Sequence, residues 1–142
     1  MPMLDSYLFF DGTCAEAMRF YQHTLGGDLQ PMLTYADAPE PDACLPSGKD
    51  RIMHACLVLD GRLLMASDTP GGGEGAMRGF AVALNYDQPA DARRIFDALG
   101  AGGSVTMPMQ KTFWCEAFGM LTDRFGVPWM VGGGAVPRPA AG

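Results

Sequence analysis

The sequence has few basic residues and no long apolar run. Only 10 of its 142 residues are Lys or Arg, against 16 Asp or Glu, and the formal net charge is −6 at pH 7. The basic residues are scattered, which argues against a nucleic-acid partner, because phosphate backbones are bound by clustered Lys and Arg. No apolar stretch is long enough to cross a bilayer, and the N-terminus lacks the pattern of a signal peptide. These absences predict a cytoplasmic protein with no nucleic-acid partner and no membrane partner.

Common cofactor and disulfide spacings are also missing. The four cysteines include no C-x-x-C pair, the spacing of zinc and redox motifs, and without a secretion signal disulfides are not expected. The glycine-rich stretch at 71–75 lacks the Gly-Lys-Ser/Thr ending of a P-loop and opens no dinucleotide-binding helix. It is therefore predicted to be a linker, and the cysteines are predicted to be buried or half-buried thiols.

One pattern occurs twice in the chain. The stretch 19–27 is echoed by 94–100, and the stretch 54–65 is echoed by 116–130. Hydrophobic periodicity predicts a strand, a helix and three strands in each copy. Strands are predicted at 6–10, 29–35, 51–59 and 62–67 in the first copy and at 79–86, 104–110, 114–122 and 127–131 in the second, with helices at 14–25 and from 89 to about 100. The predicted organisation is a first module at 1–69, a linker at 70–78, a second module at 79–132 and a disordered tail at 133–142, all in one structural domain.

Three local features accompany this pattern. Thr13-x-x-Glu16 has the form of a capping box, which would satisfy backbone N–H groups at the start of the first helix. Asp68 ends a strand beside Thr69-Pro70, where we expect it to cap a turn. The loop at 36–50 is long for a compact domain and is predicted to be either mobile or functional.

Paired β-α-β-β-β modules in this order resemble the vicinal oxygen chelate superfamily, which includes glyoxalase I, extradiol dioxygenases, fosfomycin-resistance enzymes and bleomycin-binding proteins. The stretches that carry the resemblance are 7–21, 54–68 and 112–131, the last of which reads T-F-W-C-E-A-F-G-M-L-T-D-R-F-G-V-P-W-M-V. They are most similar to the PhnB-like branch, also described as 3-demethylubiquinone methyltransferase-like. The resemblance implies an α+β fold in which the two modules form a cupped, mostly antiparallel, eight-stranded sheet.

Relatives that use a metal hold it with four side chains on the first and last strands of each module. The resemblance places these four positions at Ser6, Met65, Phe80 and Met130. None of these side chains is a good ligand for a hard or borderline divalent ion, which prefers carboxylate or imidazole. The usual metal site and any other cofactor are therefore not expected. The chain also lacks a glycine-rich nucleotide loop after its first strand, so S-adenosylmethionine binding in the usual way is not expected.

Strand alternation predicts which side chains share the concave face of the cup. His54 and Glu116 open the two echoing strands and are predicted to be equivalent residues of the repeat that enter the cup and bound its main pocket. There they would act as an acid–base pair or ligand anchor, or hold a noncanonical divalent metal together with Cys56 or Cys115. The predicted lining is mostly apolar, as in small-molecule sites. It comprises Ser6, Leu8, Cys56, Met65, Phe80, Trp114, Phe118 and Met130.

Three functions fit these features. The first is a binding protein that sequesters a planar or hydrophobic small molecule without catalysis. The second is an enzyme of unknown reaction that uses His54 and Glu116. The third is a structural or regulatory dimer with a vestigial cup. A homodimer is expected in each case, because open sheets leave edges and apolar surface that association covers.

Overall fold

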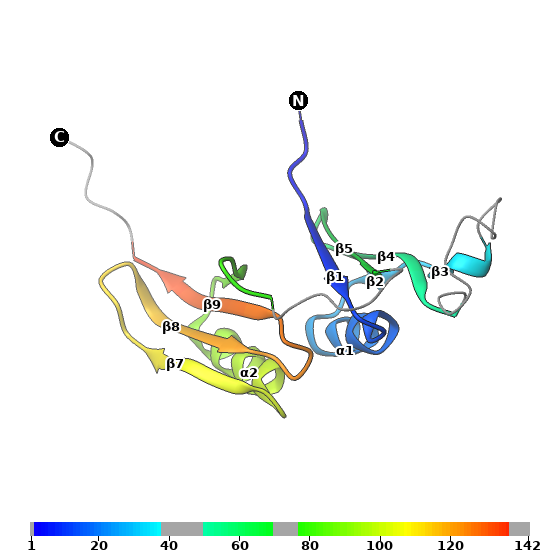
Figure 1. The fold of residues 1–142 in the computed structure, drawn as a ribbon. Coiled ribbons are helices and arrows are strands. Elements are labelled where there is room, and N and C mark those ends of the chain that lie inside the picture. Colours follow the sequence, from blue (N-terminus) through cyan, green and yellow to red (C-terminus); the bar gives the residue numbers. More distant parts are fainter. Residues whose placement is uncertain (1, 38–49, 70–76, 137–142) are drawn as a thin grey trace. The chain divides into compact units, whose positions relative to one another are not determined.

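The chain forms two compact units, Met1–Gly75 and Ala76–Gly142. The computed structural model describes residues 2–37, 50–69 and 77–136. Each unit contains one sheet with one main helix packed on one of its faces (Figure 1). The predicted α+β class with two β-α-β-β-β modules is confirmed. Most of the predicted linker at 70–78 and most of the predicted loop at 36–50, including Cys44, lie outside the described residues.

In the first unit the sheet has the strand order β1-β5-β4-β2, and β3 also pairs with β4. The edge strand β1 runs parallel to β5, whereas the other pairings are antiparallel. The elements are β1 (Ser6–Phe10), α1 (Cys14–Leu25), β2 (Asp28–Leu29), β3 (Leu33–Thr34), the short 3-10 helix η1 (Tyr35–Asp37), β4 (Ile52–Leu59) and β5 (Arg62–Asp68).

The strand predicted at 29–35 is divided in the structure. Asp28–Leu29 and Leu33–Thr34 pair with different parts of β4, and the register shifts by one residue between Leu33 and Thr34. Pro31 lies in the gap, and proline cannot donate to a strand ladder, so it interrupts the pairing. The described residues therefore form nine strands rather than the eight predicted.

The second unit has the strand order β6-β9-β8-β7. Its edge strand β6 runs parallel to β9, and the other two pairings are antiparallel, as in the first unit. The elements are β6 (Val82–Tyr86), α2 (Pro89–Gly100), β7 (Ser104–Gln110), β8 (Cys115–Thr122) and β9 (Pro128–Ala135). No helix among the described residues is long and apolar enough to span a membrane.

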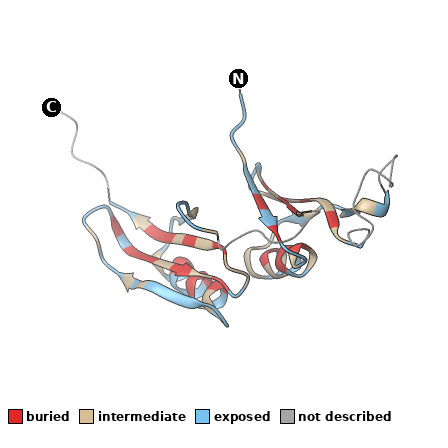
Figure 2. Ribbon diagram, viewed as in Figure 1, coloured by how far each residue is buried: buried red, intermediate tan, exposed pale blue. Residues whose placement is uncertain are grey.

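Each unit buries its core between the helix and one face of the sheet. In the first unit Met18 and Tyr21 of α1 are fully buried, as are Ala55 and Leu57 of β4. In the second unit Trp129 of β9 is 1% exposed. Figure 2 shows buried residues concentrated in the helices and the central strands, whereas the edge strand β7 is largely exposed. Within the described ranges, no α-helix of either unit packs on the opposite face of its sheet.

The start of α1 is capped by Asp68, not by the predicted capping box. Thr13 makes no side-chain capping hydrogen bond. Instead the backbone N–H of Cys14 donates to Asp68 Oδ1 at 3.0 Å, and that of Ile52 donates to Asp68 Oδ2 at 2.9 Å. The carboxylate is 2% exposed, so these bonds lie in the core. The same environment raises the pKa of the Cys14 thiol to about 12, first through burial and then through the charge of Asp68.

The disordered tail predicted at 133–142 overlaps the last strand. Strand β9 continues through Ala135, although 133–142 was predicted to be disordered because it is rich in glycine. Gly133 packs directly under α2: a Cβ built on it would lie 2.7 Å from Cβ of Ala92 and 2.8 Å from the carbonyl oxygen of Gln88. The glycines there permit close helix–sheet contact rather than disorder. Residues 137–142 lie outside the described part.

We predict that Asp68→Asn destabilises the protein. The amide can accept one of the two buried N–H bonds, but its own NH₂ group would face the other donor, and an unpaired buried donor costs about 1–3 kcal/mol. Urea unfolding followed by circular dichroism measures the loss. Asp97→Asn is the control, because it removes the same charge from an exposed site on α2 and should change the unfolding free energy by less than about 0.5 kcal/mol. Equal effects of the two variants would contradict the role given to Asp68.

We also predict that Gly133→Ala destabilises the protein by about 1–3 kcal/mol, because the new methyl group must displace α2. Gly100→Ala is the matched control. Its Cβ would approach Leu121 Cδ2 at 3.5 Å, an ordinary contact distance, and alanine is the better helix former. Thermal unfolding should show a lower midpoint for Gly133→Ala alone, and an unchanged midpoint would mean that α2 is not tightly packed on β9.

Candidate functional site

The helix-free face of the first sheet carries exposed aromatic side chains; we call it the open face of unit 1. Along β1, Leu8 and Phe10 are 3% and 2% exposed on the helix side, whereas Tyr7 and Phe9 are 39% and 56% exposed on the other side. The prediction that Leu8 lines the cup is therefore wrong. Ser6 alternates onto the same side as Leu8, so its prediction as a residue of the cup is also wrong. The neighbouring residue Tyr7 faces the open side instead.

Cross-strand pairs identify the neighbours of Tyr7 on the open face. Tyr7 lies opposite Met65, which in turn lies opposite Cys56. Because Ala55 and Leu57 are buried on the helix side, His54 and Cys56 alternate onto the open face with Met65. His54, Cys56 and Met65 thus share one face of their own sheet, and their role in lining a cup stays a prediction.

Tyr7 is the residue that contacts His54. Its hydroxyl oxygen lies 3.3 Å from His54 Nδ1, and the two ring centroids are 5.9 Å apart. Tyr7 also contacts Phe9, at 5.1 Å between centroids. Sequence reasoning missed Tyr7 because every residue from Tyr7 to Phe10 is apolar or aromatic, so alternation alone gave no sign of which side faces the core.

Cys56 lies on this face as a protonated thiol. Partial burial raises its pKa, and the negative charge of Asp5 raises it further. A thiol with a raised pKa is a poor nucleophile, because the thiolate is the reactive form. Cys56 therefore contributes a soft, weakly polar surface beside Met65.

The second sheet has a helix-free face as well, the open face of unit 2. Gly119 lies against α2, because a Cβ built on it would be 2.7 Å from Phe96 Cε2. Phe118 and Met120 therefore alternate onto the opposite side. Met130 lies between the buried Trp129 and Val131, so it shares this open face.

An aromatic cluster lies at the start of β8. Trp114 is 40% exposed and packs edge-on against Phe118, at 5.4 Å between centroids. Phe113 is 88% exposed and packs edge-on against Trp114 at 4.7 Å. The predicted proximity of Trp114 and Phe118 is thus present within unit 2. Phe80, predicted to line the cup, precedes β6 and is 46% exposed; the residue opposite Met130 on β6 is Ala83.

Glu116 is exposed, and it is not the repeat equivalent of His54. Met65 and Met130 occupy equivalent places, each on the strand that pairs parallel with the first strand of its unit. Met65 lies opposite Cys56, and Met130 lies opposite Met120, so the equivalent of His54, two residues earlier, is Phe118. The prediction of equivalence is wrong because the two copies differ in the length of their last hairpin. Whether His54 and Glu116 face a common cup stays a prediction.

The open-face residues of the two parallel strand pairs do not fit a divalent metal. On β1 and β5 these residues are Tyr7 and Met65, and on β6 and β9 they are Ala83 and Met130. This set offers neither carboxylate nor imidazole, the ligands that hard and borderline ions prefer. Among the described residues, no three His, Cys, Asp or Glu side chains are grouped so as to hold a metal ion. Cys115, once a candidate ligand, is buried and its thiol donates to the carbonyl oxygens of Ala117 and Gly133.

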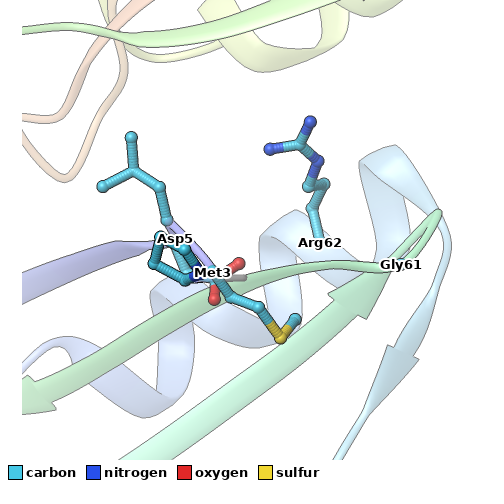
Figure 3. A pocket seen from close by; sticks show the side chains of 6 residues that line it. Met3, Asp5, Gly61 and Arg62 are labelled. Carbon is cyan, nitrogen blue, oxygen red and sulfur yellow. The ribbon is translucent and has the colours of Figure 1, made fainter.

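A pocket of about 280 Å³ lies at the end of the first sheet, and neither His54 nor Cys56 lines it (Figure 3). Its lining is formed by Pro2, Met3, Leu4, Asp5, Gly61 and Arg62. Asp5 accepts a hydrogen bond from the backbone N–H of Leu63 at 3.0 Å, and so ties the N-terminal segment to β5. His54 and Glu116 were predicted to bound the main pocket, but neither lines this one.

Comparisons with known proteins agree with this fold. Residues 3–131 match the model of the Glyoxalase/Bleomycin resistance protein/Dioxygenase superfamily. The chain is 38% identical over 140 residues to Protein YjdN of Escherichia coli (strain K12), covering 92% of this chain and 94% of that protein. The crystal structure of protein PA1353 from Pseudomonas aeruginosa is 47% identical with a TM-score of 0.86, covering 94% of this chain and 98% of that one.

A putative 3-demethylubiquinone-9 3-methyltransferase, PhnB protein, from Bacillus cereus shares the fold at 22% identity with a TM-score of 0.78, covering 93% of this chain and 99% of that one. This match is consistent with the predicted PhnB-like branch. The family predicted from the repeat and its motifs is confirmed: the chain belongs to the glyoxalase/bleomycin resistance protein/dioxygenase superfamily.

Proposed function

We propose that this protein binds a planar or hydrophobic small molecule on its open faces and does so without the usual divalent metal. The observation that carries the proposal is that each unit exposes aromatic rings on the face its helix leaves free. Tyr7 and Phe9 do so in unit 1, and Trp114, which packs against Phe118, does so in unit 2.

The physical reason is the cost of leaving such rings in water. Burying apolar surface is favourable by roughly 25 cal/mol per Å², and grouped exposed rings are a common mark of a binding surface. Aromatic rings also bind planar ligands through offset or edge-to-face contacts. The half-buried Cys56, Met65 and Met130 add a soft and adaptable apolar surface around the rings.

A second candidate is an enzyme of unknown reaction that uses His54 and Glu116. It is supported by the hydrogen-bonded partner of His54 and by the exposed carboxylate of Glu116. A noncanonical divalent metal held by these two residues belongs to the same candidate. It requires the two side chains to face one ligand, which a covalent cross-link or a spin-label distance between positions 54 and 116 can test.

We predict that planar apolar compounds raise the melting temperature, because a ligand that binds only the native state stabilises it. Trp114→Leu should weaken the binding of such a compound about two- to twelvefold, the equivalent of the roughly 0.5–1.5 kcal/mol of a ring contact. Phe20→Leu, on α1, is the control and should leave affinity unchanged. If His54→Ala and Glu116→Ala abolish metal-dependent turnover of the bound compound, the enzyme candidate is favoured. If no planar compound binds, the proposed function is wrong.

We also propose that the protein is a cytoplasmic homodimer. The strands β1 and β7 are sheet edges within the described units, and unpaired edges are often covered by association. Sedimentation at micromolar concentration should then give a mass near twice the 15.2 kDa of one chain. A mass of one chain under those conditions would contradict the dimer.

A further inference from the structure

The hydroxyl of Tyr7 and the imidazole of His54 form the one side-chain hydrogen bond found for His54 in the described part of the chain. We propose that Tyr7 positions His54 as the tautomer with its proton on Nε2, so that His54 donates a hydrogen bond to neutral planar ligands that carry a carbonyl oxygen. This inference rests on the proposed function and names the ligand class for the open face of unit 1.

The chemistry of the two groups decides the direction of the bond. The Tyr7 oxygen lies 3.3 Å from His54 Nδ1, so one of the two must donate. A phenol is a stronger hydrogen-bond donor than a neutral imidazole N–H, and an imidazole nitrogen is the stronger acceptor. Tyr7 therefore donates to Nδ1. Because a neutral imidazole carries one proton, that proton is on Nε2, the nitrogen on the far side of the ring from Tyr7.

The surroundings of this donor are apolar and aromatic. Phe9 packs against Tyr7, and Leu33, opposite His54 on β3, is 45% exposed. A ligand that receives the Nε2–H therefore lies on the side of His54 away from Tyr7, where β3 carries the exposed Leu33. The donor supplies orientation, and the apolar surface beside it supplies contact area, the combination typical of small-molecule sites.

The charges near this face favour a neutral ligand over an anion. No Lys or Arg in the described strands of unit 1 alternates onto the open face. The acidic residues nearby are Asp5, whose charge acts on Cys56, and Asp28, which lies opposite Val58 of the same face. Two carboxylates repel an anionic ligand, and a buried carboxylate on the ligand would have no cation as partner. A carbonyl oxygen needs only the single neutral donor that His54 offers.

The tautomer can be measured without any ligand. The chain has two histidines, His54 and the exposed His23 near the end of α1, which serves as an internal control. Long-range ¹H–¹⁵N correlation spectra at about pH 8, where an ordinary imidazole is neutral, distinguish a protonated from an unprotonated ring nitrogen. We expect an unprotonated Nδ1 for His54 in the wild type, and a shift toward a mixture of tautomers in Tyr7→Phe, with His23 unchanged. A protonated Nδ1 in the wild type, or no change in Tyr7→Phe, would overturn the positioning role.

The ligand class is tested with three probes of similar size. They are 2-acetylnaphthalene, which is neutral with a carbonyl, 2-ethylnaphthalene, which has no acceptor, and 2-naphthoate, which is anionic. In calorimetric titrations the wild type should bind the acetyl compound up to about tenfold more tightly than the ethyl compound, the effect of one hydrogen bond. It should bind the naphthoate more weakly than the acetyl compound.

Two substitutions at position 54 separate the hydrogen bond from shape. In His54→Gln the amide nitrogen occupies roughly the place of Nε2 and should keep the preference for the acetyl compound. In His54→Asn it occupies roughly the place of Nδ1 and should lose that preference. Circular dichroism and thermal unfolding establish that both variants fold.

The outcomes distinguish this inference from the proposed function. If the wild type binds all three naphthalenes equally, planar binding stands and the donor role of His54 is overturned. If 2-naphthoate binds most tightly, the neutral ligand class is overturned in favour of an anion. If none binds, both the ligand class and the proposed function fail, while the spectra still decide the role of Tyr7.

Discussion

The first unit depends on one buried carboxylate. Asp68 ends β5, and its two oxygens accept the N–H groups that begin α1 and β4. Its backbone carbonyl also accepts the hydroxyl of Tyr35 at 2.8 Å, which fixes the short helix η1 to the same point. A carboxylate that is 2% exposed persists in a core only when its oxygens are satisfied, so these elements must meet at the end of β5. The side of the sheet that α1 covers, and hence the side left open, follows from this junction.

The second unit solves the same problem with a different carboxylate. Asp123 follows β8, is 3% exposed and accepts the N–H groups of Phe125 and Val127 in the turn to β9. Its other oxygen accepts the indole N–H of Trp129 at 2.9 Å, which holds the largest core side chain under α2. In both units a buried acid at a strand end fixes a helix or hairpin on one face. The opposite face is thereby free to differ in chemistry between the copies: Tyr7 and His54 in one, Trp114 and Phe118 in the other.

Most elements were predictable because their signals are local, whereas the errors came from contacts between distant residues. Apolar periodicity and the turn residues located both helices and seven of the strands to within a few residues. The cap of α1 was misassigned because the sequence near Thr13 offers a plausible local cap, and only the folded chain brings Asp68 to it. Gly133 was taken for a tail residue because a glycine required for close packing and a glycine in a disordered segment look alike in sequence.

The residues of the candidate site could be assigned to a face only where strand alternation gave a clear signal. His54 and Cys56 were predicted to share one face of their strand because Ala55 and Leu57, which alternate with them, are apolar, and in the structure both are buried on the helix side. Strand β1 gave no such guide, so Leu8 was chosen where Tyr7 is exposed. The equivalence of His54 and Glu116 failed because sequence offsets count residues in hairpins, whereas the register of the parallel strands fixes equivalence in space.

The paired positions on the parallel strands explain how such a fold can recognise a ligand without a metal. On its two parallel strand pairs, this chain has Tyr7 beside Met65 and Ala83 beside Met130. A metal holds a substrate through strong, directional bonds to oxygen, and none of these four side chains can replace that bond alone. Orientation must then come from a neutral donor, and affinity from contact with rings and thioethers. Because a neutral hydrogen bond contributes only about 0.5–1.5 kcal/mol net, a site of this kind distinguishes ligands mainly by shape and by the acceptor they present to His54.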